Sequence, residues 1–286
     1  MNNKNVWFIT GCSTGFGRAL ATHLLENDYR VAVTARDAGK VQDLVDINPG
    51  NALAIALDVT NPEQVKAAVE KAESHFGRVD VLVNNAGFGY FGAIEESDEA
   101  DVRSMFEANF WGLAEMTRAI LPKMRERRSG TIVNVSSIGG FVAFPGIGYY
   151  NASKFAVNGF TESLKKEVAP LGINVILVQP SGFRTDWAGR SANDATNKIA
   201  DYAETAGTNQ ATIRGFSGNQ PGDPKRAAKA IVQAVEAADP PFNLLLGKAA
   251  LKNARIKVDG LTSEFDTWAE VTEGADFPET GAADAK

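Results

Sequence analysis

The chain has 286 residues, 44% of them hydrophobic and 22% charged, which is the composition of an ordinary globular protein. Its formal net charge of −6 at pH 7 argues against nucleic acid and anionic membranes as the main partners. The single cysteine, Cys12, excludes an internal disulfide and a zinc cluster built from cysteines. No signal-peptide pattern precedes the first apolar run, and no run reaches the roughly 18 residues of a membrane span, so we expect a cytoplasmic protein.

Short apolar runs alternate with longer amphipathic stretches along the chain. The runs predict strands at 6–10, 30–35, 52–57, 79–83, 130–135, 173–178 and 242–246. The amphipathic stretches predict helices at 17–27, 62–75, 104–127, 149–169 and 224–237, and Asn61 before Pro62 is a typical helix start. This alternation predicts parallel strands joined by helical crossovers. We therefore predict a single α/β domain, residues 1–286, with a doubly wound parallel sheet and helices on both faces.

Two segments interrupt the alternation. Residues 183–223 are polar and rich in Gly and Ala, and they follow the sixth predicted strand. Ligands of α/β proteins bind outside the carboxyl ends of the strands, so this segment is predicted to be a substrate lid, with a surface excursion of no functional role as the alternative. The acidic, Ala- and Gly-rich stretch from about residue 271 is predicted to be a loosely held tail.

A glycine-rich turn connects the first predicted strand to the first helix. Glycine recurs in it as Gly-x-x-x-Gly-x-Gly, which lets the backbone approach a pyrophosphate at the N-terminus of the helix. The pattern alone also suits a simple tight turn, but its place after the first strand favours nucleotide binding. The residues predicted to hold the cofactor here are Gly11, Ser13, Thr14, Gly15, Phe16 and Gly17. We interpret Cys12 as a small loop residue.

The end of the second strand indicates which nicotinamide cofactor binds. A carboxylate there favours NAD, through the ribose 2′-hydroxyl, whereas an arginine favours the 2′-phosphate of NADP. Ala35 occupies the position expected for the carboxylate, and Arg36 follows it. NADP(H) is therefore predicted. NAD(H) remains the alternative because of Asp37, since an error of one residue in the predicted strand end would change the assignment.

Tyr150 and Lys154 are four residues apart, so on a helix they lie on one face, one turn apart. A phenol with a pKa near 10 is a poor acid or base at neutral pH, and a nearby ammonium favours the phenolate. Lowering that pKa by about three units takes about 4 kcal/mol. Tyr149 would point away from the lysine. The Tyr-x-x-x-Lys spacing is weak evidence alone, because it is common on helices.

Further candidates lie where other strands end. Ser137 follows the fifth predicted strand, where its hydroxyl could bond a substrate oxygen that gains negative charge. Small residues after the fourth strand would let a nucleotide lie against the backbone at Asn85, Ala86 and Gly87. Asn109 falls inside a predicted helix, where its amide is either a satisfied structural group or a link in a proton relay.

In combination, these residues resemble the motifs of the short-chain dehydrogenase/reductase superfamily in its single-domain form, from Val6 to about Gly247. The resemblance rests on Thr10-Gly11-x-x-x-Gly15-x-Gly17, Asp58-Val59, Asn84-Asn85-Ala86-Gly87, Asn109, Ser137 and Tyr150-x-x-x-Lys154. The step of 13 residues from Ser137 to Tyr150 matches the family's spacing, so Ser137 rather than Ser136 takes the role of its serine.

The resemblance implies a Rossmann sheet of about seven strands and a catalytic tetrad of Asn109, Ser137, Tyr150 and Lys154. Ser137 would hold the substrate oxygen, Tyr150 would pass the proton, Lys154 would bind the nicotinamide ribose, and Asn109 would anchor a water relay. It also implies a homodimer or homotetramer built through the long helices between the fourth and sixth strands.

The remaining cofactor contacts are also implied by the resemblance. Asp58, followed by Val59, would meet adenine, and Pro180, Gly182 and Thr185 would lie near the nicotinamide. One departure is Ser181, which stands where the family has glycine, so the backbone of this loop could follow a different path, while Thr185 can still meet the nicotinamide carboxamide.

Aromatic residues suggest an apolar ketone, aldehyde or secondary alcohol as the small-molecule substrate. Those expected near the nicotinamide are Phe88, Tyr90, Phe91, Phe141, Phe144, Phe183 and Trp187, although packing is an alternative role for each.

A non-catalytic NADP(H)-binding sensor is the alternative function. A sugar-nucleotide epimerase is disfavoured, since no large C-terminal substrate domain follows. A metal site is disfavoured because His23 and His75 lie on separate predicted helices.

Overall fold

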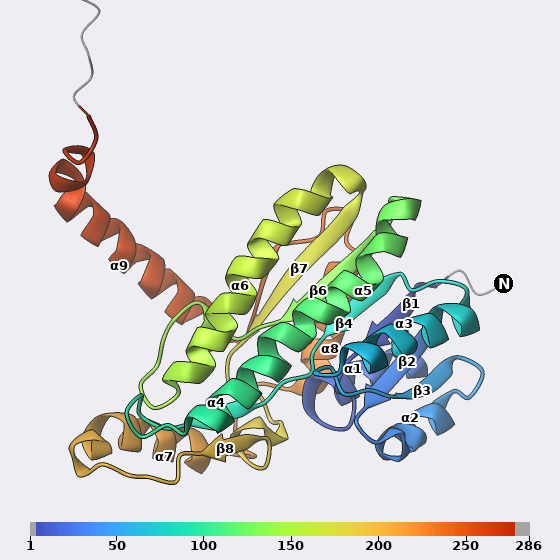
Figure 1. Cartoon of the computed structure of the whole chain (residues 1–286), viewed down its shortest axis with the longest axis horizontal. Coiled ribbons are helices and arrows are strands. Elements are labelled where there is room, and N and C mark those ends of the chain that lie inside the picture. Colours follow the sequence, from blue (N-terminus) through green and yellow to red (C-terminus); the bar gives the residue numbers. More distant parts are fainter. Residues whose placement is uncertain (1–3, 278–286) are drawn as a thin grey trace, which may run out of the picture.

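Seven parallel strands form one sheet in the computed structural model, which describes residues 4–277 (Figure 1). The strands are β1 (Val6–Ile9), β2 (Arg30–Ala35), β3 (Ala52–Ala56), β4 (Val81–Asn84), β6 (Gly130–Val135), β7 (Ile173–Pro180) and β9 (Asn243–Leu246). Their order is β3-β2-β1-β4-β6-β7-β9, so the chain winds outward in one direction from β1 and in the other from β4. Ligands of such sheets bind at this reversal, outside the carboxyl ends of the strands.

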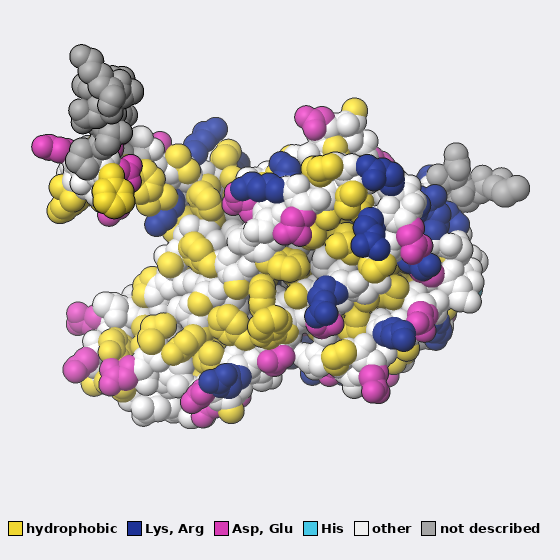
Figure 2. All heavy atoms as spheres, turned by 45° about the horizontal axis from the view of Figure 1, so that its top comes forward, with side chains coloured by type: hydrophobic (Ala, Val, Ile, Leu, Met, Phe, Trp, Pro, Cys, Tyr) yellow, Lys and Arg dark blue, Asp and Glu magenta, His cyan; other side chains and the backbone are white. Residues whose placement is uncertain are grey.

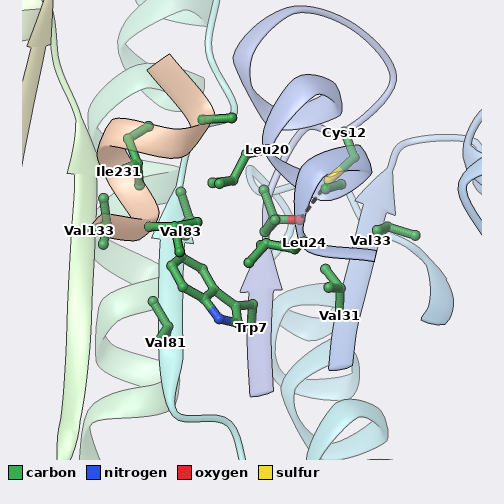
Figure 3. Packing of buried hydrophobic residues seen from close by; sticks show 14 of the residues in the cluster. Trp7, Cys12, Leu20, Leu24, Val31, Val33, Val81, Val83, Val133 and Ile231 are labelled. Atoms are coloured by element: carbon green, nitrogen blue, oxygen red, sulfur yellow. Dashed lines mark hydrogen bonds between the residues drawn. The ribbon is translucent and has the colours of Figure 1, made fainter. Parts of the chain in front are cut away.

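Helices cover both faces of the sheet, which confirms the predicted fold class. One face packs against α1 (Gly15–Glu26), α2 (Gln42–Ile47) and α8 (Pro224–Val235), and the other against α3 (Pro62–Phe76), α5 (Gly112–Arg127) and α6 (Gly148–Val168). Figure 3 shows the first interface, where Leu24 of α1, Ile231 of α8 and Trp7 of β1 belong to one buried cluster. Asn61 caps α3 as predicted, because its Oδ1 accepts from the N–H groups of Glu63 and Gln64.

The helix predicted at 104–127 is longer and interrupted. It consists of α4 (Glu99–Phe106), a π-helical turn (Glu107–Trp111) and α5. A π turn inserts one residue into the helical repeat and often marks a functional position. No local pattern in the sequence predicted this insertion.

Several elements were not predicted. β5 (Gly89–Phe91) and β8 (Ala192–Asp194) form a separate two-stranded sheet, α7 (Thr208–Gly215) follows them, and α9 (Lys248–Glu273) projects from the body (Figure 1). The first residues of the predicted tail, 271–273, form the end of α9, while residues 278–286 lie outside the described part of the chain. None of the described helices is long and apolar enough to cross a membrane.

Cys12 is part of the core beneath the glycine-rich turn (Figure 3). Its thiol donates to the Ile9 carbonyl oxygen at 3.3 Å. Burial raises the pKa of Cys12 to about 12, although the thiol lies near the N-terminus of a helix. The thiol is therefore a packing group, in agreement with its interpretation as a small loop residue.

We expect Cys12 to resist iodoacetamide in the folded protein at pH 8, because the side chain is buried and its thiolate forms only near pH 12. In guanidinium chloride the thiol regains an ordinary pKa and should react at least about a hundredfold faster. Mass spectrometry measures the alkylated fraction over time. Rapid labelling of the folded protein would contradict the packing described for this turn.

Candidate functional site

The glycine-rich turn is held against the end of β4. Asn85 donates from Nδ2 to the carbonyl oxygens of Thr10 (2.8 Å) and Gly11 (2.9 Å). The Thr10 hydroxyl oxygen accepts from the main-chain N–H groups of Asn85 and Ala86, each at 2.9 Å. A Cβ at Gly17 would lie only 2.4 Å from Asn85 Nδ2 and from the Gly11 carbonyl oxygen. This close approach requires glycine at position 17 and makes Asn85 a brace for the turn.

The N-terminus of α1 suits an anion. Thr14, the N-cap residue, makes no side-chain capping bond, and the first turn contains no acidic residue. Gly11 and Gly15 have φ values of +71° and +60°, which side chains other than glycine rarely adopt. The first N–H groups of a helix lack intrahelical partners and carry partial positive charge. The turn therefore fits the pyrophosphate of a dinucleotide.

Three of the predicted catalytic residues meet near the carboxyl end of β6. Ser137 follows β6, while Tyr150 and Lys154 lie near the start of α6. The Ser137 hydroxyl is hydrogen-bonded to the Tyr150 side chain and also accepts from the Gly139 N–H at 3.0 Å. Lys154 Nζ donates to the Val135 carbonyl oxygen at 3.0 Å and lies 5.9 Å from the centre of the Tyr150 ring.

Burial shifts the two titratable groups of this cluster in opposite directions. It raises the pKa of Tyr150 to about 12, and the hydrogen bond with Ser137 opposes that rise. It lowers the pKa of Lys154 to about 8. In both residues the neutral form is favoured because the charged form has lost contact with water. A polar or anionic group placed between the two side chains would lower the free-energy cost of burying the charged Lys154 ammonium.

Asn109 is buried in the π-helical turn before α5. Its Oδ1 accepts from the Phe88 N–H at 2.9 Å, and its Nδ2 donates to the Phe88 carbonyl oxygen (3.0 Å) and to Ser153 Oγ (3.2 Å). Gly87 lies against this amide and the lysine, since a Cβ there would be 2.7 Å from Asn109 Oδ1 and 3.8 Å from Lys154 Nζ. The amide is thus a satisfied structural group, and the proton relay stays a prediction.

The end of β2 falls at Ala35, where it was predicted. Asp37 caps the short 3₁₀ turn that follows, because its Oδ1 accepts from the Gly39 N–H at 2.9 Å. Arg36 is exposed. The carboxylate that could favour NAD is therefore engaged in a backbone cap, whereas the guanidinium that could favour NADP is accessible.

Arg18, which was not among the predicted site residues, lies between the glycine-rich turn and the segment after β2. Its Nη1 donates to the carbonyl oxygens of Ser13 and Lys40, both at 3.5 Å, and its Nη2 pairs with Asp43. A basic residue directly after the last glycine of the turn is the sequence signal that could have identified it. Arg18 adds a second guanidinium beside the turn.

The turn after β3 carries the residues predicted to meet adenine. Asp58 Oδ1 accepts from both the N–H (2.9 Å) and the hydroxyl (2.7 Å) of Thr60, and Val59 is buried. The carboxylate therefore shapes this turn. A contact with adenine stays a prediction.

The loop after Pro180, the last residue of β7, is attached to the neighbouring strand at Ser181. The Ser181 N–H donates to the Leu246 carbonyl oxygen at 3.0 Å, which extends the pairing of β7 with β9. Thr185 lies opposite the glycine-rich turn, because a Cβ at Gly15 would be 3.7 Å from Thr185 Cβ. Gly182, which lies between Ser181 and Thr185 in the chain, is exposed. The loop and the turn thus border the same space.

The segment predicted to be a lid, 183–223, contains β8 and α7 next to α4 (Figure 1). It is joined to the body by the parallel pairing of β8 with β5 and by the buried Glu96 carboxylate. Glu96 accepts from the N–H groups of Ala93 and Ile199, both at 2.9 Å, and these bonds lower its pKa. Whether the segment opens and closes stays a prediction.

The predicted pocket aromatics separate into two groups. Phe88, Tyr90, Phe91, Phe144 and Trp187 belong to the hydrophobic cluster that contains Tyr150. The Trp187 and Tyr150 ring centres are 4.8 Å apart. The other two lie elsewhere, because Phe183 packs on Phe16 at 5.0 Å and Phe141 packs at the base of α9.

Comparison with known proteins agrees with this geometry. A family model described as short chain dehydrogenase matches residues 5–196. The chain belongs to the short-chain dehydrogenase/reductase superfamily. It is 37% identical to the oxidoreductase BOA17 of Botryotinia fuckeliana, over 93% of this chain and 97% of that protein. It is 40% identical to a 3-ketodihydrosphingosine reductase of Bacteroides thetaiotaomicron, over 84% of this chain and 86% of that protein.

Solved structures of short-chain dehydrogenases share the fold. One from Streptomyces avermitilis is 41% identical, with a TM-score of 0.91 over 96% of this chain and 100% of that chain. One from Burkholderia phymatum in complex with NAD is 28% identical, with a TM-score of 0.80 over 91% and 95% of the two chains. ElxO with NADP bound is 29% identical, with a TM-score of 0.71 over 87% and 99%. The protein is an oxidoreductase of a family that binds nicotinamide cofactors.

We expect Gly17→Ala to lower the free energy of unfolding by about 1–3 kcal/mol and to weaken cofactor binding, because the new Cβ would overlap Asn85 and the Gly11 carbonyl. Gly159→Ala in α6 is the matched control, since a Cβ there meets nothing within 4 Å. Alanine at a helical position is favourable by up to about 1 kcal/mol. Denaturant unfolding and cofactor titration of both variants measure the difference. Equal behaviour of the two would contradict the close approach at position 17.

Proposed function

We propose that the protein transfers a hydride between NADP(H) and the carbon of a carbonyl or secondary alcohol, with Tyr150 as the general acid and base. The observation that carries this proposal is that the half-buried Ser137 and the buried Tyr150 and Lys154 lie together beside the glycine-rich turn. Ala86 and Gly87 connect the glycine-rich turn with this catalytic cluster. A Cβ at Gly11 would lie 3.0 Å from Ala86 Cα, and Gly87 borders Lys154.

The bound nicotinamide supplies or accepts the hydride. In the reducing direction, Tyr150 Oη donates its proton to the carbonyl oxygen, and in the oxidising direction it accepts the proton of the alcohol. The Ser137 hydroxyl donates a hydrogen bond to the same oxygen as negative charge develops on it. Because Ser137 Oγ already accepts from the Gly139 N–H, its own proton is oriented away from that bond.

Lys154 acts on Tyr150 through its charge. Its ammonium has three N–H donors, one of which bonds the Val135 carbonyl, so others can hold the hydroxyls of a ribose. Bringing the Tyr150 phenol from a pKa of about 12 to about 7 takes about 7 kcal/mol, far more than a solvent-exposed charge pair supplies. Exclusion of water around Lys154 is therefore part of the mechanism. Asn109 fixes the main chain at Phe88 beside this site and, as we propose, anchors the water that returns the proton.

The preference for NADP(H) over NAD(H) rests on the charges beside β2. The Arg36 guanidinium is exposed, and the Asp37 carboxylate is used in a backbone cap. Arg18, one turn into α1, also lies beside Ser13, although its guanidinium is paired with Asp43. A guanidinium matches the oxygens of a phosphate group, whereas the 2′-hydroxyl of NAD offers no charge to pair.

An apolar ketone or aldehyde is the substrate class that the surroundings of Tyr150 favour. Tyr90 and Phe91 are fully buried, so the aromatic surface left for a substrate is that of Phe88, Phe144 and Trp187. The relative named 3-ketodihydrosphingosine reductase agrees with a long apolar ketone. We propose that the segment 183–223 closes over this substrate and brings Trp187 onto it.

We also propose that the protein forms a homo-oligomer through α5 and α6, as the family resemblance implies. Two large apolar side chains support a contact there. Trp111 at the start of α5 is 53% exposed, and Phe155 of α6 is 43% exposed.

We expect Tyr150→Phe to lower kcat by about a hundred- to ten-thousandfold, because the general acid is lost while the ring and its packing remain. NADPH affinity should change little. Tyr149→Phe is the matched control, since Tyr149 packs in the same hydrophobic cluster and lies outside the proposed proton path. Steady-state kinetics on a panel of apolar ketones measures the effect. Undiminished turnover by Tyr150→Phe would refute the acid–base assignment.

We expect Arg36→Ala to weaken NADPH binding at least about tenfold, a change of 1.4 kcal/mol or more, since a charged partner of the 2′-phosphate is removed. NADH binding should stay nearly constant. Arg103→Ala, at an exposed site on α4, is the control for the loss of one positive charge. Calorimetric titration with both cofactors gives the ratio. An equal loss for NADPH and NADH would show that Arg36 does not recognise the 2′-phosphate.

A further inference from the structure

The last described helix, α9, is attached to the body at its base alone. Ala250 and Ala254 are the buried residues of this helix of 26 residues, and they pack with Ile138, Phe141 and Leu245. At 1.5 Å per residue the helix is about 39 Å long. Figure 1 shows it projecting from the sheet and its covering helices. Most of its length therefore contacts no other part of residues 4–277.

An apolar seam runs along α9 at the spacing of a coiled coil. Apolar residues recur at alternating steps of three and four, in the order Leu251, Ala254, Val258, Leu261, Phe265 and Trp268. This heptad spacing places all six on one face and is the pattern by which helices pair. Val258, Phe265 and Trp268 are 49%, 64% and 58% exposed. The seam thus lies open to solvent over the outer turns of the helix.

Charge is divided between the two halves of α9. The inner half, 248–258, carries four cations and no acid, namely Lys248, Lys252, Arg255 and Lys257. The outer half, 259–273, carries five acids and no cation, namely Asp259, Glu264, Asp266, Glu270 and Glu273. Figure 2 shows acidic and hydrophobic side chains together on the projecting arm. A helix that pairs with a copy of itself in the opposite direction would bring each basic half against an acidic half.

We propose that α9 is an assembly arm that pairs antiparallel with α9 of a second copy of this chain. One register satisfies both the seam and the charges. It sets Leu251 against Trp268 of the second copy, and Val258 against Leu261 of the second copy. The flanking Lys257 then lies near Glu264 of the second copy. Twofold symmetry repeats each pair, which is the usual construction of a closed dimer.

The division of charge also favours a second copy of the chain, rather than a membrane surface, as the partner of α9. A helix that lies on a membrane carries its cations around its apolar face. In α9 the most exposed aromatic residues, Phe265 and Trp268, are instead accompanied by Glu264, Asp266 and Glu270. A parallel pair of α9 helices is disfavoured for the same reason, because like charges would meet along its whole length.

Pairing in this way places the arm near the proposed substrate site. Phe144 packs both with the cluster at the base of α9 and with the cluster that contains Tyr150. The antiparallel register brings the outer end of the second copy's arm to that base. This contact is separate from the oligomer contact proposed for α5 and α6, and it does not depend on the proposed reaction.

The test is the mass of the full chain in solution. Phe265→Glu introduces a charge into the seam and should halve the mass measured by sedimentation velocity, from dimer to monomer if α9 is the sole contact, or from tetramer to dimer if the contact through α5 and α6 also forms. Ile256→Glu is the matched control, because Ile256 is similarly exposed (58%) but lies on the opposite face of α9. Unchanged circular dichroism and cofactor affinity ensure that both variants are folded. An unchanged mass for Phe265→Glu, or an equal effect of both variants, would overturn the proposal.

The direction of pairing is tested by charge reversal. Lys257→Glu alone and Glu264→Lys alone should each weaken association by about tenfold at low salt, as two symmetry-related pairs of modest strength are lost. The double reversal should restore association, because each new lysine again faces a new glutamate. Failure of the double variant to recover would contradict the antiparallel register. Binding of a monomeric protein to phospholipid vesicles through the arm would contradict the choice of partner.

Discussion

The contact between the end of β4 and the glycine-rich turn is the constraint on which the site depends. Asn85 holds the carbonyl oxygens of Thr10 and Gly11, and Gly17 lies too close to these groups for any side chain. The contact fixes the N-terminus of α1 at the point where the order of the strands reverses. At this edge a dinucleotide would meet the first N–H groups of α1, a first helical turn without acidic residues, and Gly87 next to Lys154.

Burial then determines the chemistry of the cluster beside the turn. The fall in the pKa of Lys154 from 10.5 to about 8 corresponds to a cost of about 3 kcal/mol for its charge at neutral pH. The same surroundings keep Tyr150 protonated. Binding of an anionic or polar ligand beside Lys154 would therefore be more favourable than binding of an apolar one, because it would replace the lost contact of the ammonium with water. Under the proposed function, burial keeps Tyr150 protonated at rest, and the Lys154 ammonium would stabilise the phenolate that forms during turnover.

Much of this could be predicted from the sequence because the signals are local. Alternating strands and helices gave the doubly wound sheet, and the spacing of Tyr150 and Lys154 placed both on one face of α6. What the sequence did not yield depends on distant contacts. β5 and β8 are three residues each and exist because they pair across about 100 residues of chain. The bracing role of Asn85 and the cap made by Asp37 required coordinates, since neither has a distinctive spacing.

Titration of the unmodified protein with NADPH and, separately, with NADH, followed by nicotinamide fluorescence, tests the proposed cofactor site. We expect saturable binding of both, with NADPH bound at least about tenfold more tightly because a 2′-phosphate would find a charged partner at Arg36. A preference for NADH would contradict the assignment of the β2 end. Absence of binding by either cofactor would contradict the identification of the glycine-rich turn as a dinucleotide site.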